Sequence, residues 1–199
     1  MEVESGCWKV RPSPYLVYIG GKDSEKMAFY SIGQIGDPKY VIKTKPPELR
    51  GKQIRASCYG WLILRDKQNN HYSLWNPLTL EFICLPALVL KPEQVISSRI
   101  LSFPPGNHDS MLILFEKNVP LFIFCRIGDE KWTHQPITEN FKHVEGDFLT
   151  NFVVCNGTLY CNTFRFSKLV KIDLSMQDNH YLALVLLDVS IPELLESYY

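Results

Sequence analysis

Histidine and cysteine carry the most versatile side-chain chemistry in this chain, because they bind metals and act as bases or nucleophiles. The histidines are His71, His108, His134, His143 and His180, and the cysteines are Cys7, Cys58, Cys84, Cys125, Cys155 and Cys161. No H-x-x-x-H, H-E-x-x-H or C-x-x-C spacing occurs among them. We therefore expect no metal site, no cofactor, and free thiols in a reducing compartment, either cytoplasmic or nuclear.

One short run, His108-Asp109-Ser110, contains the three residue types of a serine-nucleophile triad. Adjacent residues seldom point at one another as a triad requires. The preceding Pro104-Pro105-Gly106-Asn107 is typical of a turn. We interpret the run as part of a loop and predict no catalytic residue there.

Carboxylate pairs are the other possible catalytic groups, since two acids can serve as the general acid and base of a hydrolase. The acids in predicted loops are Asp66, Asp129, Glu130, Glu145 and Asp147. Nothing in the sequence pairs them. We expect solvated loop charges and no enzyme, and we keep as the alternative a propeller-type hydrolase acting on a carbohydrate or small molecule.

The charge balance bears on the class of partner. The 199 residues contain 21 Lys+Arg and 21 Asp+Glu, a formal net charge of zero. Such a balance argues against dedicated nucleic-acid or anionic-membrane binding. One stretch, Lys39 to Arg55, is locally basic and is a candidate contact for an acidic partner or a nucleic acid, but we favour a solvated loop around Pro46-Pro47.

Membrane segments and export signals are not expected. The N-terminus, Met1 to Trp8, carries acids where a signal peptide would carry cations. The longest apolar runs, such as Val119 to Cys125 and Leu182 to Leu187, are far shorter than the roughly 20 residues that span a bilayer.

Short apolar or alternating runs separated by Gly, Pro, Asn and Asp predict an all-β protein. The predicted strands are Tyr15 to Ile19, Ala28 to Ile32, Gly60 to Arg65, Tyr72 to Trp75, Glu81 to Leu85, Ile100 to Phe103, Met111 to Phe115, Leu121 to Arg126, Phe152 to Cys155, Thr158 to Thr163, Leu169 to Asp173 and Tyr181 to Leu187. In the hairpin after Gly60 we expect Leu62, Leu64 and Leu74 in the core, with Trp61 pointing the other way between sheets.

A repeat is visible in the spacing of two hairpins. Gly60 precedes one that ends at Asn76, and Gly157 precedes one that ends at Asp173, with a similar hairpin between them at Met111 to Arg126. Units of about 40 to 50 residues are typical of β-propeller blades. The spacing predicts a partial or small β-propeller of about four blades of antiparallel strands.

Several motifs, taken in order, resemble the plant F-box-associated β-propeller family of the KIB type. They are Ser13 to Val17, Gly60-Trp61-Leu62 with Asp66, Leu74-Trp75-Asn76-Pro77 with Leu85-Pro86, Gly128-Asp129 with Trp132, and Gly157 to Tyr160 with Ile172-Asp173. The resemblance covers residues 12–199, and residues 1–11 are expected to be a short extension. Within these motifs we expect structural roles for Gly60, Trp61, Asn76, Pro77, Gly128, Asp129, Trp132 and Gly157.

The resemblance implies a non-catalytic, protein-binding module, similar to the substrate-recognition domain of F-box proteins in cullin-RING ubiquitin ligases. Its partner is expected to be a protein, with no nucleic acid and no membrane. Family members usually carry an F-box of about 40 residues before the propeller and extend further at the C-terminus, so we expect no direct adaptor docking by this sequence and an incomplete propeller.

Overall fold

A computed structural model describes the chain in nine segments and divides it into two compact units, Met1–Gly51 and Lys52–Tyr199. The described residues are 15–20, 26–31, 40–42, 47–119, 121–136, 149–155, 158–164, 168–174 and 182–187. Side chains are described from residue 47 onward, except those of residues 183–186.

The first unit contains one antiparallel sheet. Its strands are β1 (Tyr15–Gly20), β2 (Lys26–Ser31) and β3 (Tyr40–Ile42), in the order β1-β2-β3. A 3₁₀ turn, η2 (Pro47–Leu49), follows them along the chain.

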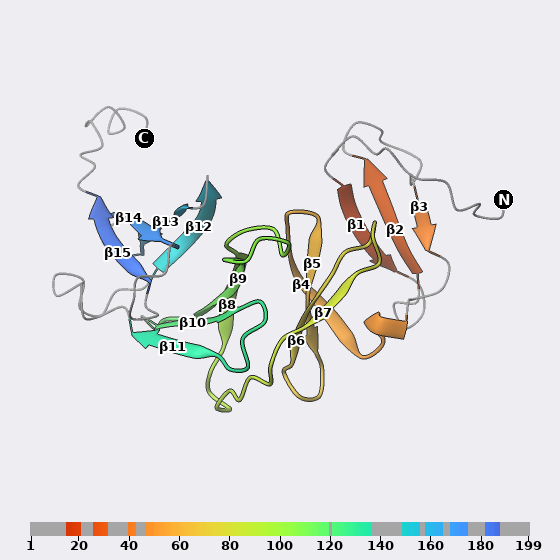
Figure 1. Ribbon diagram of the computed structural model, residues 1–199, viewed down its shortest axis with the longest axis horizontal. Coiled ribbons are helices and arrows are strands. Elements are labelled where there is room, and N and C mark those ends of the chain that lie inside the picture. Colours follow the sequence, from red (N-terminus) through yellow and green to blue (C-terminus); the bar gives the residue numbers. More distant parts are fainter. Residues whose placement is uncertain are drawn as a thin grey trace, which may run out of the picture. The chain divides into compact units, whose positions relative to one another are not determined.

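The second unit contains three antiparallel sheets of four strands, each a meander in sequence order (Figure 1). The first sheet is β4 (Lys52–Cys58), β5 (Trp61–Asp66), β6 (Tyr72–Trp75) and β7 (Phe82–Cys84). The second is β8 (Ile96–Leu101), β9 (Met111–Glu116), β10 (Leu121–Arg126) and β11 (Thr133–Pro136). The third is β12 (Leu149–Cys155), β13 (Thr158–Thr163), β14 (Leu169–Asp173) and β15 (Ala183–Leu187).

Two hydrophobic cores join these sheets face to face. The core between the β4–β7 and β8–β11 sheets is built around Trp61, Leu74, Leu112, Ile123 and Trp132. The core between the β8–β11 and β12–β15 sheets contains Phe115, Phe122 and Phe124 opposite residues of β13 and β14. The first strands β4, β8 and β12 lie next to one another in that order. Consecutive four-stranded meanders stacked in this way are blades, which confirms the predicted all-β, partial propeller fold.

The same irregularity occurs in the first strand of each four-stranded sheet. The register against the second strand shifts between Ile54 and Ala56 in β4, between Ile96 and Ser98 in β8, and between Thr150 and Val153 in β12. A β-bulge bends its strand and increases the local twist. The repeated bulge shows that the three sheets are built to one plan.

The structure corrects three expectations. Part of the basic stretch predicted as a loop is strand β4, in which the exposed Arg55 lies between the half-buried Ile54 and Ala56. Strands β3 and β11 were not predicted, because they are short and β11 has little apolar character.

The face assignment in the β5–β6 hairpin also differs from the expectation. Leu74 pairs with Ile63, so it shares the face of Trp61 rather than that of Leu62 and Leu64. All five of these side chains are buried.

Candidate functional site

Two turns project from the same end of the β4–β7 sheet, because alternate connections of a meander lie at one end. The β4–β5 turn contains Tyr59, and the β6–β7 turn contains Leu78 and Leu80. These three side chains are 47%, 55% and 67% exposed. We call them the turn surface. Exposed apolar side chains on turns at one end of a sheet are available for contact with a partner.

The turns form for local reasons. Tyr59 and Gly60 have φ angles of +52° and +77°, which are the signs that a two-residue hairpin turn of type I′ requires. In the second turn the Asn76 side-chain oxygen accepts the N–H groups of Leu78 at 2.9 Å and Thr79 at 3.3 Å. The Leu80 N–H donates to the Asn76 carbonyl at 2.8 Å and closes the turn.

Two members of the turn surface have unusual backbone conformations. Among the described residues, those other than glycine with positive φ are Tyr59, Asn70, Leu80, Asn118 and Asn151. Asparagine tolerates this region, whereas a bulky side chain there costs roughly 1–2 kcal/mol. Tyr59 and Leu80 are therefore held outward at some cost in stability, and such outliers cluster at functional sites.

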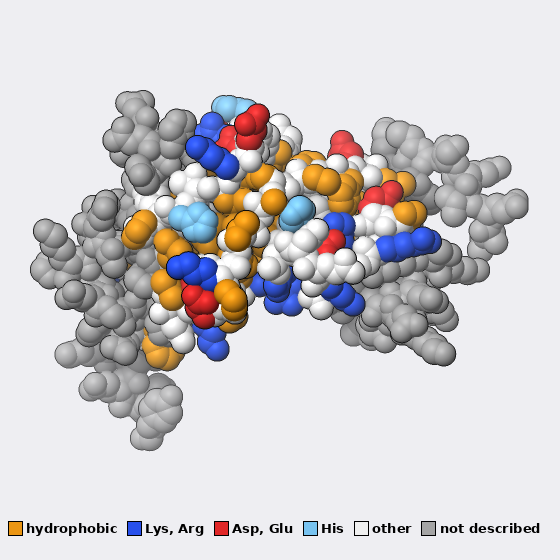
Figure 2. Space-filling view, turned by 90° about the horizontal axis from the view of Figure 1, so that it is seen from below, with side chains coloured by type: hydrophobic (Ala, Val, Ile, Leu, Met, Phe, Trp, Pro, Cys, Tyr) orange, Lys and Arg blue, Asp and Glu red, His pale blue; other side chains and the backbone are white. Residues whose placement is uncertain are grey.

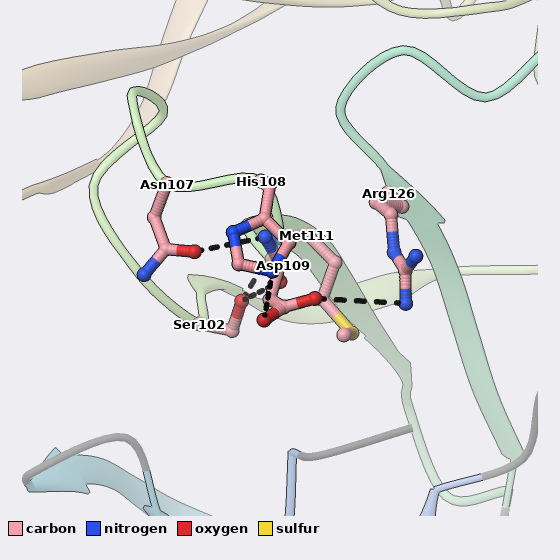
Figure 3. Close-up of polar contacts among 6 residues, drawn as sticks. All are labelled: Ser102, Asn107, His108, Asp109, Met111 and Arg126. Carbon is pink, nitrogen blue, oxygen red and sulfur yellow. Dashed lines mark hydrogen bonds and ion pairs between the residues drawn. The ribbon is translucent and has the colours of Figure 1, made fainter. Parts of the chain in front are cut away.

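A longer polar loop runs from Ser102 to Ser110 between β8 and β9, and Figure 3 shows its contacts. The Tyr59 hydroxyl donates to the Ser102 carbonyl at 3.1 Å and joins the loop to the turn surface. Within the loop, the Ser102 hydroxyl accepts the Met111 N–H at 2.9 Å, and the Asn107 side chain accepts the Asp109 N–H at 2.8 Å. These bonds fix the shape of the loop without help from a ligand.

The His108-Asp109-Ser110 run is not a nucleophilic triad. His108 Nε2 lies 3.0 Å from Asp109 Oδ2, and Arg126 Nη2 lies 3.9 Å from the other carboxylate oxygen (Figure 3). In a triad the carboxylate holds Nδ1 and leaves Nε2 for the serine. Ser110 is fully buried, and its hydroxyl donates to the Phe103 carbonyl at 2.7 Å. The acid and histidine thus form a polar contact at the surface, while the serine supports the loop.

The loop acids that the structure describes do not pair either. Asp66 lies at the end of β5 away from the turn surface, 3.8 Å from Lys52 Nζ. The Gln68 N–H and the Lys52 ammonium lower the pKa of its carboxyl group, in that order of effect. Asp129 lies in the turn that follows Arg126, and Arg126 contacts Asp109 in the β8–β9 loop. This turn is at the opposite end of the strands from Asp66. Glu130 is exposed in the same turn as Asp129, and Glu145 and Asp147 lie outside the described residues.

Trp132 links two sheets. Its indole N–H donates to the Pro86 carbonyl at 2.9 Å, and its ring meets the edge of Tyr72 with 5.9 Å between centroids. Trp61 is buried in the same core. Both tryptophans therefore pack between sheets.

The remaining motif residues lie at turns. Gly60 and Gly128 have positive φ, Asn76 and Pro77 begin the β6–β7 turn, and the Asp129 N–H donates to the Arg126 carbonyl at 3.1 Å. Gly157 falls outside the described residues. Sequence analysis missed Tyr59, Leu78 and Leu80, although apolar residues inside a turn signal could have marked them.

The described part of the chain bears on three other kinds of function through its cysteine thiols, its metal-ligand residue types and its helices. Its five cysteines are free, and burial raises the pKa of Cys125 and Cys161 to about 12. Nowhere in that part do three His, Cys, Asp or Glu residues gather as metal ligands would. Among the same residues there is no helix with the length and apolarity to cross a membrane.

Figure 2 shows basic and acidic side chains interspersed with hydrophobic ones on the face that it displays.

Comparison with known proteins places this arrangement in a family. The sequence matches the KIB1-4 beta-propeller family over residues 29–197. The chain belongs to this family. It is 26% identical over 152 residues to an F-box/kelch-repeat protein of Arabidopsis thaliana, covering 75% of this chain and 41% of that protein. It is 29% identical over 119 residues to an F-box protein of the same plant, covering 57% of this chain and 28% of the relative. The chain thus spans less than half the length of these relatives.

Proposed function

We propose that this KIB-type propeller is a protein-recognition module of the F-box class, which selects a substrate protein for a cullin-RING ubiquitin ligase in the cytosol or nucleus. Its similarity to two F-box proteins supports this class of function. The turn surface is the contact that we assign to the partner, and the module itself performs no chemistry.

The single observation that carries the proposal is the exposure of Tyr59 and Leu80 on strained turns. Apart from the Tyr59 hydroxyl bond to Ser102, nothing in the described part of the β4–β7 sheet needs these side chains outside, because the core beside the sheet is filled by other residues. An asparagine or glycine would satisfy either backbone at lower cost. Aromatic and aliphatic anchors of this kind supply most of the binding free energy at protein interfaces.

The polar loop beside the turn surface fits the rim of such an interface. His108 is exposed and Asp109 is half-exposed, so their polar atoms offer hydrogen bonds at the margin of an apolar contact. A hydrophobic centre with a polar rim is the usual anatomy of a protein interface.

The test compares partners bound by the full chain and by two variants. The double substitution Tyr59→Ser with Leu80→Asn removes the apolar tips, and asparagine keeps the left-handed backbone of residue 80. The matched control is Val119→Asn, an exposed apolar residue in the β9–β10 turn at the other end of the sheets. Quantitative cross-linking mass spectrometry in plant cells would report the partners of each.

We expect one set of proteins to be lost with the double variant and retained with Val119→Asn, while all three proteins unfold cooperatively. In the double variant, loss of the Tyr59–Ser102 bond and relief of strain at residue 80 act on the melting temperature in opposite directions. Identical partner sets for all three proteins would contradict the assignment of the turn surface.

A further inference from the structure

The connection between β7 and β8 contains a strand-like segment that pairs with no strand of the described residues. Residues 85–91 run without a turn or bend. Leu88 is 3% exposed in the core between the sheets, and Leu90 packs against the same core. Ala87 is exposed, and Val89 is 86% exposed. The side chains thus alternate in and out with the period of a β-strand.

The backbone of this segment is open. At one end the Pro86 carbonyl accepts the Trp132 indole, and at the other the Lys91 N–H donates to the Gln94 side chain at 2.8 Å. Between these bonds, no hydrogen bond joins the backbone of residues 87–90 to any described part of the chain. We call residues 87–90 the open strand.

We propose that the open strand binds an extended segment of a partner protein by backbone pairing, with an apolar side chain of that segment packed against Val89. This inference rests on the proposed protein-recognition function and names a second contact and the conformation of its ligand. The open strand offers donors and acceptors in the spacing of a β-ladder, which an extended peptide satisfies. A helix cannot do so, because its backbone groups are already paired.

The composition of the open strand favours an apolar peptide over a charged one. Ala87-Leu88-Val89-Leu90 contains no charge, and the nearest charged residues are Lys91 and Glu93. Natural proteins usually protect such an edge with a lysine, a proline or a bulge. Here the exposed positions are alanine and valine, so the edge is left available for pairing.

The open strand is also held ready for binding. Leu88 anchors it in the core, and the bond from Trp132 fixes the residue just before it. A segment already held in its bound conformation loses less conformational entropy on association.

The first experiment selects ligands for the intact 199-residue chain from phage-displayed random decapeptides. The bound peptides are synthesised, and amide hydrogen exchange is measured with and without them. We expect selected peptides with alternating apolar residues, and slower exchange at residues 87–90. No enrichment, or protection confined to other amides, would overturn the proposal.

Three variants at one position sharpen the result. Val89→Pro removes a single N–H and should weaken peptide binding by about tenfold, the upper range for one hydrogen bond. Val89→Asp keeps the N–H but places a charge against the apolar partner, and it serves if the proline variant fails to fold. Val89→Ile keeps a β-branched apolar side chain and the N–H and should bind within about threefold of the parent. Equal binding by the parent, Val89→Pro and Val89→Asp would refute backbone pairing at this site.

Two outcomes separate this inference from the proposed function. If cross-linked cellular partners are lost with the turn-surface variant but all persist with Val89→Pro and Val89→Asp, the proposed function stands and the open strand is not a contact. If light scattering shows a dimer of the parent that Val89→Pro dissociates, the open strand pairs with a second copy, and the partner-protein assignment is wrong.

Discussion

The β8–β11 and β12–β15 sheets have the same topology but differ in how their faces are covered. In β9, the five residues Met111 to Phe115 are all buried. In β13, buried residues such as Leu159 and Cys161 alternate with half-buried ones such as Tyr160. The first sheet contributes residues to both hydrophobic cores, and the second contributes to one.

This difference shows that the sequence of a blade records its place in the stack. A strand covered on both faces is a continuous apolar run, whereas a strand covered on one face alternates. Met-Leu-Ile-Leu-Phe and Thr-Leu-Tyr-Cys-Asn are the two patterns in equivalent strands. Substitutions in the sheets test whether their contributions to the free energy of unfolding differ as their burial does.

The largest contrast is expected between Phe122 and Tyr160. Phe122 is fully buried and meets the edge of Phe115 with 5.3 Å between ring centroids. Phe122→Ala should lower the free energy of unfolding by about 4 kcal/mol, because the core cannot close over the cavity. Tyr160→Ala, on the less covered face, should cost about 1 kcal/mol. Urea denaturation measures both, and equal losses would show that the faces are equally packed.

Trp132 tests the core on the β4–β7 side. Trp132→Ala removes the ring from its contact with Tyr72 and leaves the Pro86 carbonyl without its donor. We expect a loss of about 3 kcal/mol in the free energy of unfolding. Trp132→Phe is the control and should lose less than half as much. A loss below 1 kcal/mol for Trp132→Ala in the urea titration would place the indole outside the core.

Gln135 tests the junction on the other side. Its buried amide donates to the Leu182 carbonyl and accepts the Leu182 N–H, both at 2.8 Å. Gln135→Ala leaves both backbone groups unpaired and should cost about 2 kcal/mol, with faster amide exchange at residue 182. Gln135→Glu keeps the acceptor but loses the donor, so it should not restore stability. Unchanged exchange at residue 182 would show that water replaces the amide without cost.

Gly60 tests a turn that is outside both cores. A Cβ at this position meets no atom within 4 Å, so Gly60→Ala would report only the cost of φ = +77°. We expect about 1 kcal/mol in thermal denaturation. Gly106→Ala is the control, because its Cβ also meets no atom and its φ is not positive. Equal stabilities of the two variants would mean that the Tyr59-Gly60 turn relaxes freely.

The smallest effect concerns Asp66. The pKa of its carboxyl group is lowered in the folded chain, so the ionised form stabilises the fold. This stabilisation is fully present above the unfolded-state pKa and is lost as the pH falls through the folded-state pKa. Asp66→Asn should remove less than about 0.5 kcal/mol at pH 7, because the Lys52 pair is partly exposed. It should also flatten the pH dependence of stability in the acid range. A profile identical to that of the parent between pH 2 and 6 would show no linkage.

The sequence predicted the hairpins whose strands are apolar and end in clear turn residues. The second and third strands of each four-stranded sheet, such as β5 and β6, fall where alternation and glycine placed them. Strand β4 was missed because its inward residues, Ile54, Ala56 and Cys58, are small or separated by polar ones. Their burial depends on the facing sheet, which a local pattern does not contain.

The candidate site was less predictable than the fold. The exposure of Tyr59 and Leu80 follows from a positive φ angle, and no propensity of tyrosine or leucine favours that conformation. The open strand was predicted neither as a strand nor as a site. Its special feature is that its backbone makes no hydrogen bond to the described residues, and side-chain types do not reveal this. Both features depend on backbone geometry, which appears only when the chain is folded.

The repeated bulge in β4, β8 and β12 has a consequence for how this molecule can vary. Each bulge helps to pin the register between the first and second strands of its own sheet. The β4–β5 turn is short and the β8–β9 loop is long, yet both begin from strands with the same irregularity. Loops of new length and composition can therefore be grafted onto this end of the sheets while the framework stays unchanged, which makes it a scaffold for altering binding specificity by loop exchange.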